Sequence, residues 1–443
     1  MVGVAVLLLS IALSPWLAAA PRLAAPAQSS ATSPPSHAVV RSPTSPPAPP
    51  VGYTLTPAQR ARALAYAHAQ YRDYFLAVAL ALAIYFLFWV LQVGAVLRRR
   101  ARKISPRLFV QCLIVTPLLL GAAALVEWPL DYHSSFVLGH RFGLSTESFG
   151  AWLADWGKSL ALELIAAIFL VWVFYLLVRR SPRRGWFYFW CLTLPLGLCI
   201  ALVEPYVIEP LFFKFTPLEQ KHPVLVERIE QMLHHAGLRI PPSRIFEMDA
   251  SAKTRELNAY VSGLGPSKRV VVWNTTLHAL SADEVLEVLG HETGHYVLHH
   301  IVKEFIWDEL VALVFFWLGF RVFEWALARW GPQTGLEGTG DVASLPLVLL
   351  ILALLVFFSD PVVNAISRHY EHQADKFALQ VTEGVVPNPN AAEAQAFQVL
   401  GERDLSDPDP SPFIRFWLYS HPPIADRIRF AETYRPASTA PAR

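Results

Sequence analysis

The sequence is short of cysteine, of charged residues and of any surplus of one sign of charge. Its 443 residues include three cysteines, and Cys112, Cys191 and Cys199 all lie inside apolar runs. A free cysteine in apolar surroundings usually behaves as a small hydrophobic residue, so we infer neither a disulfide framework nor a cysteine metal site. Charged residues make up 16% of the chain and the net charge is +2, which suggests no nucleic-acid partner.

Apolar residues are abundant instead. They form 54% of the chain, with 27 Phe and 14 Trp, more than an ordinary soluble enzyme contains. Six apolar segments approach the length of roughly 20 residues that a helix needs to cross a bilayer. We therefore predict a mainly α-helical, multi-pass membrane bundle or barrel, with spans at about 74–97, 108–130, 159–178, 186–209, 306–328 and 344–360.

The N-terminal region has a different composition. Residues 1–20 are apolar and end in small residues, as in a signal peptide, although a first membrane helix is the alternative. Residues 21–56 are rich in Pro, Ser and Ala and form a linker that cannot bury a core. We expect an N-terminal membrane domain over 57–210 and a second domain over 211–435 that holds the last two spans.

A more polar stretch of mixed structure separates the fourth span from the fifth. Residues 222–238 have helical spacing and close on Gly237, while 244–249 and 268–274 have the β-branched and aromatic content of short strands. Ser281 lies three residues before Glu284, which is the capping-box signature of a helix start. The stretch therefore predicts a small α+β unit that is embedded between membrane helices.

The helix that starts at Ser281 contains the sequence His-Glu-Thr-Gly-His. Its two histidines, His291 and His295, are four residues apart and project from one helical face, where both can bind one cation. Glu292 lies beside them. In zinc proteases of the HExxH type, this glutamate acts as the general base and acid. A surface helix with solvated histidines is the alternative interpretation of the pentapeptide.

A catalytic zinc usually takes three protein ligands, so a third is needed. Residues 364–379 offer Glu371, with Asp375 one turn further on, where it can orient a zinc-bound histidine. His299 is rejected, because on one straight helix it would lie about 12 Å along the axis from His291. The metzincin pattern is excluded by Leu298 and Ile301.

Three motifs, "GHETGH", "NAISRHYEHQADKFA" and "YSHPPIADRI", together resemble the type I CAAX prenyl protease family of membrane zinc metallopeptidases. The resemblance covers about residues 70–430 and includes the Asn-Ala-Tyr element at 258–260. It implies one Zn²⁺ per chain on His291, His295 and Glu371, with Glu292 as general base and acid. It also implies a helical barrel around a water-filled chamber.

The resemblance adds candidates near the cleft. Asn258 and Tyr260 match the element that pairs with substrate backbone as an edge strand, and Arg427 matches a position near the metal. His421 matches a second such position, where donation to the oxyanion and a buried structural role are both open. Four carboxylates in or beside the spans fit an aqueous cavity or helix ends: Glu163, Asp308, Glu309 and Glu324.

The expected activity is zinc-dependent endopeptidase cleavage of peptide or protein substrates at the membrane. The substrates are either prenylated tails or, as in a quality-control protease, damaged membrane-associated proteins. A catalytically silent membrane scaffold is a further alternative, although the complete motif set argues against it. A transporter with a regulatory metal has less support, because the spans show no internal repeat.

The membrane side of the site stays open. Basic clusters at 98–103 and 179–184 should be cytoplasmic, which places the zinc site outside the cytoplasm. The family's eukaryotic members imply the reverse, and the loop 329–343 is faintly acidic where this arrangement requires it to be basic.

Overall fold

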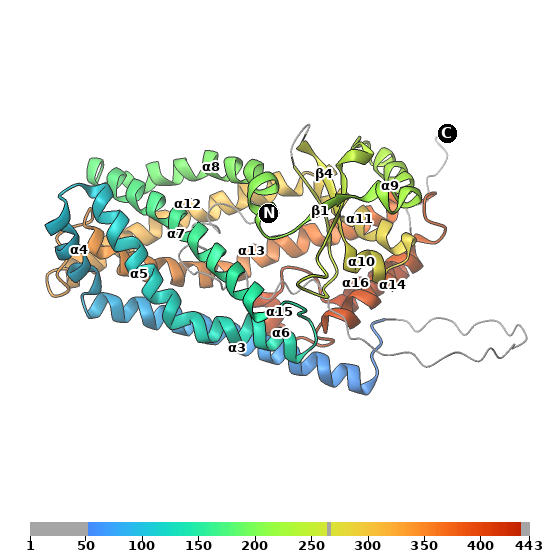
Figure 1. The fold of residues 1–443 in the computed structure, drawn as a ribbon, viewed down its shortest axis with the longest axis horizontal. Helices are drawn as coiled ribbons and strands as arrows, with labels where there is room; N and C mark the ends of the chain where they lie inside the picture. The colour runs from blue at the N-terminus through green and yellow to red at the C-terminus, as the bar shows by residue number, and fades with distance from the viewer. Residues whose placement is uncertain (1–51, 264–266, 436–443) are drawn as a thin grey trace, which may run out of the picture.

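The computed structural model describes residues 52–263 and 267–435. The expected signal peptide at 1–20 and most of the linker at 21–56 lie outside the described residues. The described residues are mostly helical, with one small sheet, which confirms the predicted fold class. The molecule is elongated, with long helices along most of its length and the sheet toward one end (Figure 1).

The membrane region contains six helical segments long and apolar enough to cross a bilayer within the described part of the chain, as predicted. These segments contain the helices α3 (Pro57–Val90), α5 (Leu108–Asp131), α7 (Phe149–Arg180), α8 (Gly185–Val203), α12 (His300–Trp330) and α13 (Leu345–Val381). Helix α5 continues through a π-helical turn, Tyr132–Val137, into α6 (Leu138–Arg141). Many large apolar side chains on these helices are exposed, as lipid contact requires.

The first span ends earlier than the apolar run predicted. Helix α3 stops at Val90, and Gln92 takes a left-handed conformation with φ 57°, which breaks the helix. The chain restarts as α4 (Val93–Ile104), whose basic residues lie between Arg98 and Lys103. A short amphipathic helix of this kind suits the membrane interface better than the hydrocarbon core.

The acidic loop after α12 packs against this basic end of the bundle (Figure 1). Arg98 is buried and pairs with Asp341, while both guanidinium Nη atoms of Arg102 donate to the carboxylate of Glu337 at 2.7 and 2.8 Å. Arg179 donates to the carbonyl of Gly340 at 2.8 Å. The acidic residues of this loop therefore neutralise part of the arginine cluster. The negative charge of the loop is thus compatible with its position at the basic end of the bundle.

The small soluble unit is built on a four-stranded sheet in the order β1-β2-β4-β3. Its strands are β1 (Phe215–Pro217), β2 (Ile245–Met248), β3 (Ala259–Ser262) and β4 (Arg269–Trp273), which confirms the two strands predicted from the sequence. Strand β4 is buried throughout and pairs with β2 in parallel, and β3 is an antiparallel edge strand. A free edge can accept another extended chain.

Helices cover this sheet and connect it to the bundle. They are α9 (Pro223–His235), α10 (Asn274–Ala279), α11 (Ala282–Val297), α14 (Pro389–Asp404), α15 (Pro412–Leu418) and α16 (Ile424–Thr433). Leu286 and Leu289 of α11 and Ile229 of α9 are fully buried against the strands in one apolar core. As predicted, Gly237 ends the α9 segment, with φ 72°.

The intramembrane carboxylates have different surroundings. Glu309 is buried and accepts a hydrogen bond from Thr193 Oγ1 at 3.0 Å. Glu324 forms an ion pair of 2.9 Å with Arg321, whose side chain is mostly exposed. Asp308 lines an apolar cavity, which is described below. The expected water-filled chamber stays a prediction.

Candidate active site

Helix α11 presents the two histidines of the pentapeptide. Its start is fixed by the predicted capping box, since the Ser281 hydroxyl accepts from the Glu284 amide and the Glu284 carboxylate accepts from the Ser281 amide. The helix runs without a break to Val297, so His291 and His295 share one face. Local sequence therefore accounts for half of the candidate site.

Two glycines let α11 approach α13 closely. A Cβ at Gly290 would lie 3.2 Å from the Cα of Ala378, and a Cβ at Gly294 would lie 3.2 Å from the Cα of Ala374. Both distances are tighter than ordinary side-chain contacts. The glycines that directly precede each histidine thus bring α11 against the part of α13 that carries Glu371.

Glu371 lies against both imidazoles. Its Oε2 is 3.2 Å from His291 Nε2, its Oε1 is 3.3 Å from His295 Nε2, and the two Nε2 atoms are 3.1 Å apart. One ligand atom from each residue falls within 4.8 Å of the others. The structure thereby brings together three residues from two helices that are separated by more than 70 positions in the sequence.

The chemistry of this cluster fits a metal ion. Two imidazole nitrogens and a carboxylate oxygen are donors that divalent transition metals accept. Glu371 is 5% exposed, and its Oε2 accepts no well-aligned hydrogen bond from the described residues, although imidazole nitrogens of His291 and His421 lie 3.2 and 3.1 Å away. A buried carboxylate is costly without a compensating charge, and a cation between the three groups would stabilise it.

Asp375 and Arg427 form a second layer behind His291. Asp375 Oδ1 lies 2.8 Å from His291 Nδ1, and Asp375 also accepts two hydrogen bonds from Arg427, of 2.5 and 3.1 Å. With Nδ1 donating to Asp375, the Nε2 lone pair of His291 faces Glu371 and His295. Arg427 is buried, so its contacts are those of a positioning residue, and a direct contact with substrate stays a prediction.

We expect Asp375→Asn to weaken metal binding about 10- to 100-fold, as is typical when the partner of a ligating histidine is lost. The variant would keep an isosteric side chain but lose the charge that holds both His291 and Arg427. Metal affinity is measured by competition with a chromogenic chelator. Asp426→Asn, which removes an exposed carboxylate one residue before Arg427, is the control and should leave the affinity unchanged. Equal affinities for both variants would contradict the assigned role.

Glu292 and His421 are the two candidates for proton chemistry. Burial raises the pKa of Glu292 above its usual range, which is the direction that suits a carboxyl group that takes up and returns a proton. His421 Nε2 lies 3.1 Å from Glu371 Oε2, and burial lowers the pKa of His421 to about 4. His421 is therefore a neutral imidazole at pH 7 that can still donate through one nitrogen.

The Asn-Ala-Tyr element lies at the free edge of the sheet. Tyr260 belongs to β3, and its hydroxyl donates to Glu209 at 2.8 Å. Asn258 precedes the strand, and its backbone amide donates to Thr276 Oγ1 at 2.7 Å. Strand β3 packs against α11, so its edge lies on the helix that carries the histidines. A role in binding substrate stays a prediction for both residues.

His300 contacts the cluster, although no motif in the sequence singled it out. Its Nδ1 is 3.3 Å from His295 Nδ1, its Nε2 is 3.1 Å from Gln373 Oε1, and its ring stacks on Tyr370. The assumption of one straight helix is wrong here, because α11 ends at Val297 and His299 has φ 57°. This turn places His300 against His295, while His299 is not part of the cluster.

An apolar helical bundle that carries a small sheet and a buried His-His-Glu cluster is the architecture of a membrane metalloprotease. Comparisons with known proteins agree. A family model described as peptidase family M48 matches residues 219–435, and one described as CAAX prenyl protease N-terminal, five membrane helices, matches residues 36–214. The chain belongs to peptidase family M48, to which its resemblance to CAAX prenyl proteases pointed.

Individual relatives match most of the chain. The uncharacterized metalloprotease YhfN of Bacillus subtilis (strain 168) is 33% identical over 381 residues, which are 85% of this chain and 86% of the relative. CAAX prenyl protease 1 of Saccharomyces cerevisiae is 30% identical over 72% of this chain and 71% of its own. The crystal structure of S. mikatae Ste24p superposes with a TM-score of 0.74 at 25% identity, covering 86% of this chain and 90% of that one.

Proposed function

We propose that the protein is a zinc-dependent endopeptidase with one Zn²⁺ held by His291, His295 and Glu371. The observation that carries the proposal is the spacing of the three side chains. Two atoms bound to one tetrahedral zinc at about 2.0 to 2.1 Å lie roughly 3.3 Å apart. The two Nε2 atoms are 3.1 Å apart, and each lies 3.2 to 3.3 Å from one of the two Glu371 carboxylate oxygens. One ligand atom from each residue lies within 4.8 Å of the others, a spacing that one ion can bridge after small side-chain shifts.

The remaining residues supply the proton transfers and the orientation. When bound, zinc polarises the scissile carbonyl and lowers the pKa of water toward neutrality. Glu292 accepts the proton that the attacking water loses and gives it to the leaving amine nitrogen. His421 donates to the oxygen that becomes negative as the carbonyl carbon turns tetrahedral. Asp375 keeps His291 in one tautomer and one orientation throughout.

Substrate binding is assigned to the edge of the sheet. An extended peptide that pairs with β3 would be held by main-chain hydrogen bonds next to α11. Such pairing recognises the peptide backbone of the substrate, so any specificity for its side chains must come from the residues around the edge strand. The proposed substrates are peptide segments of membrane-associated proteins, with prenylated C-terminal tails as the first class to test, because relatives are named CAAX prenyl proteases.

Cleavage by the purified protein in detergent tests this function. Peptides with and without a farnesyl group should be cut, cleavage should stop after chelation, and about one equivalent of Zn²⁺ should restore it. A preference for the farnesylated peptide would favour prenyl processing, and equal cleavage would favour a quality-control protease. Cleavage that survives complete removal of the metal would refute the proposal.

We also expect the metallopeptidase unit to face away from the cytoplasm. The arginine clusters lie at the α4 end of the bundle, and the sheet lies toward the other end (Figure 1). Since basic ends are retained in the cytoplasm, alkaline phosphatase fused at the C-terminus should be active and a fluorescent protein fused there should be dark. Reporters inserted at Gly338, in the loop at the basic end, should give the opposite pair of results. A bright C-terminal fusion would place the site in the cytoplasm.

A further inference from the structure

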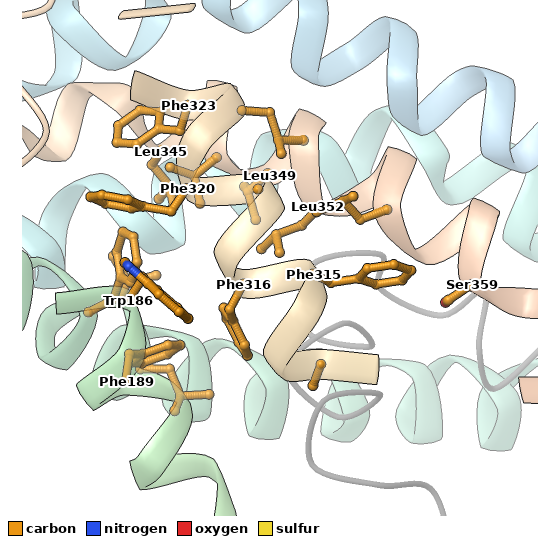
Figure 2. A pocket seen from close by; sticks show the side chains of 18 of the residues that line it. Trp186, Phe189, Phe315, Phe316, Phe320, Phe323, Leu345, Leu349, Leu352 and Ser359 are labelled. Carbon is orange, nitrogen blue, oxygen red and sulfur yellow. The ribbon is translucent and has the colours of Figure 1, made fainter. Parts of the chain in front are cut away.

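An apolar cavity of about 140 Å³ lies among the membrane helices, apart from the candidate active site (Figure 2). It is lined by α7, α8, α12 and α13, with one residue from α5. Among its lining residues, only Asp308, Ser359 and the indole of Trp186 carry a polar side-chain atom. Cavities of this character exclude water and take up apolar ligands.

The cavity is long and narrow. Its lining extends along α13 from Leu345 to Val363, which is about 27 Å of helix, and along α12 from Asp308 to Phe323, about 22 Å. A flexible hydrocarbon chain fits such a shape better than a compact ligand does. The Leu345 end is about 39 Å along α13 from Glu371, whereas Val363 at the other end is about 12 Å from it. A group attached near a bond cut at the metal cluster would therefore not reach the Leu345 end.

One end of the cavity lies beside arginines that pair with no described residue. Figure 2 shows Trp186 and Leu345 at the opposite end from Ser359. Trp186 comes directly after the turn that carries Arg183 and Arg184, both of which are exposed, as is Arg180. No described residue forms an ion pair or side-chain hydrogen bond with these three arginines. The neighbouring Arg179, in contrast, is bound to the carbonyl of Gly340.

We propose that the cavity holds one acyl chain of an anionic phospholipid whose phosphate is bound by Arg180, Arg183 and Arg184. Two independent observations support this pairing: an elongated apolar cavity between membrane helices, and exposed guanidinium groups at its mouth. Arginine is well suited to phosphate, because its planar group donates two parallel hydrogen bonds. Trp186 lies between chain and headgroup, at the depth where indoles are enriched in membranes.

Lipid binding to the delipidated protein in detergent tests the proposal. The probes are phosphatidylglycerol and phosphatidylcholine with identical acyl chains, and bound lipid is counted by native mass spectrometry. We expect the protein to retain phosphatidylglycerol about 100-fold more strongly at low ionic strength, since three juxtamembrane arginines each contribute roughly fivefold, and the preference should fall as salt screens the charges. The triple variant R180Q/R183Q/R184Q should lose this preference and bind both lipids weakly and equally.

Two further variants distinguish binding of the lipid headgroup from binding of the acyl chain. Arg99 and Arg100 are exposed on α4, which contributes no residue to the cavity, so R99Q/R100Q should keep the preference for phosphatidylglycerol. Ala312→Phe, which fills the cavity, should lower retention of both lipids at least fivefold. If the Arg180, Arg183 and Arg184 variant kept the preference, the headgroup site would be refuted. Stoichiometric displacement of the lipid by a farnesylated peptide would assign the cavity to substrate and overturn the proposal.

Discussion

Replacing Glu292 with Gln should lower the rate of peptide cleavage about 10³-fold and leave the metal content unchanged. Glutamine occupies the same volume but cannot accept a proton from water, and a positioned general base contributes about 10² to 10⁴ in rate. Glu292 is not part of the His-His-Glu cluster, so the donor set for the ion stays intact. The loss should therefore appear in kcat, measured beside metal content by atomic spectrometry.

Glu287→Gln is the matched control for this experiment. Glu287 lies on the same helix, is buried, and has a pKa that burial raises to about 8, so that it is mostly protonated at pH 7. Its replacement by an uncharged isostere should change cleavage less than twofold. If Glu292→Gln retained the parent rate while Glu287→Gln did not, the proton chemistry would be assigned to the wrong carboxyl group.

Replacing His295 with Ala should remove both the bound metal and the activity, while His299→Ala should remove neither. Loss of a protein ligand leaves two donors for an ion that normally takes three. We therefore expect metal binding to weaken by more than about 100-fold, a larger effect than the loss of a residue that only orients a ligand. His299 carries the same side chain four residues later, but it lies in the left-handed turn outside the cluster. The two variants thus differ only in the position of the imidazole.

The readouts for this pair are metal content and thermal stability with and without added Zn²⁺. Bound metal stabilises only the form that binds it, so zinc should raise the melting temperature of the parent and of His299→Ala, but not of His295→Ala. Zinc-dependent stabilisation of His295→Ala equal to that of the parent would exclude His295 as a ligand. Loss of metal from His299→Ala would instead mean that the turn at His299 is needed to shape the site.

The sequence predicted features that depend on neighbouring residues. Helical spacing and a capping box located α11, and the period of the helix placed His291 and His295 on one face. The strands at β2 and β4 followed from their β-branched content. Segment ends were less accurate, as the break at Gln92 shows, because hydropathy does not register a single left-handed residue.

Glu371, the third member of the cluster, could be suggested as a ligand from the sequence, but its position relative to the two histidines could not be predicted. Glu371 lies in a charged helical pattern that, taken on its own, fits a solvated surface helix equally well. In the structure α13 continues from the last membrane span into this pattern, and Gly290 and Gly294 bring it against α11. Glu371 could therefore be suggested only because zinc requires a third ligand and because the sequence resembles a known family. Its distance from the histidines is set by the packing of α13 against α11.

The sequence by itself determined the membrane spans, the small mixed unit and the shared face of the two histidines. Each of these follows from the pattern of apolar and polar residues within a short stretch of the chain. Tertiary structure alone decided that Arg427 reaches Asp375 and His291, that Glu371 lies against both imidazoles, and that an apolar cavity ends beside arginines that pair with no described residue. These contacts join segments up to 136 residues apart. They depend on how whole helices pack against one another, which no local repeat in the chain records.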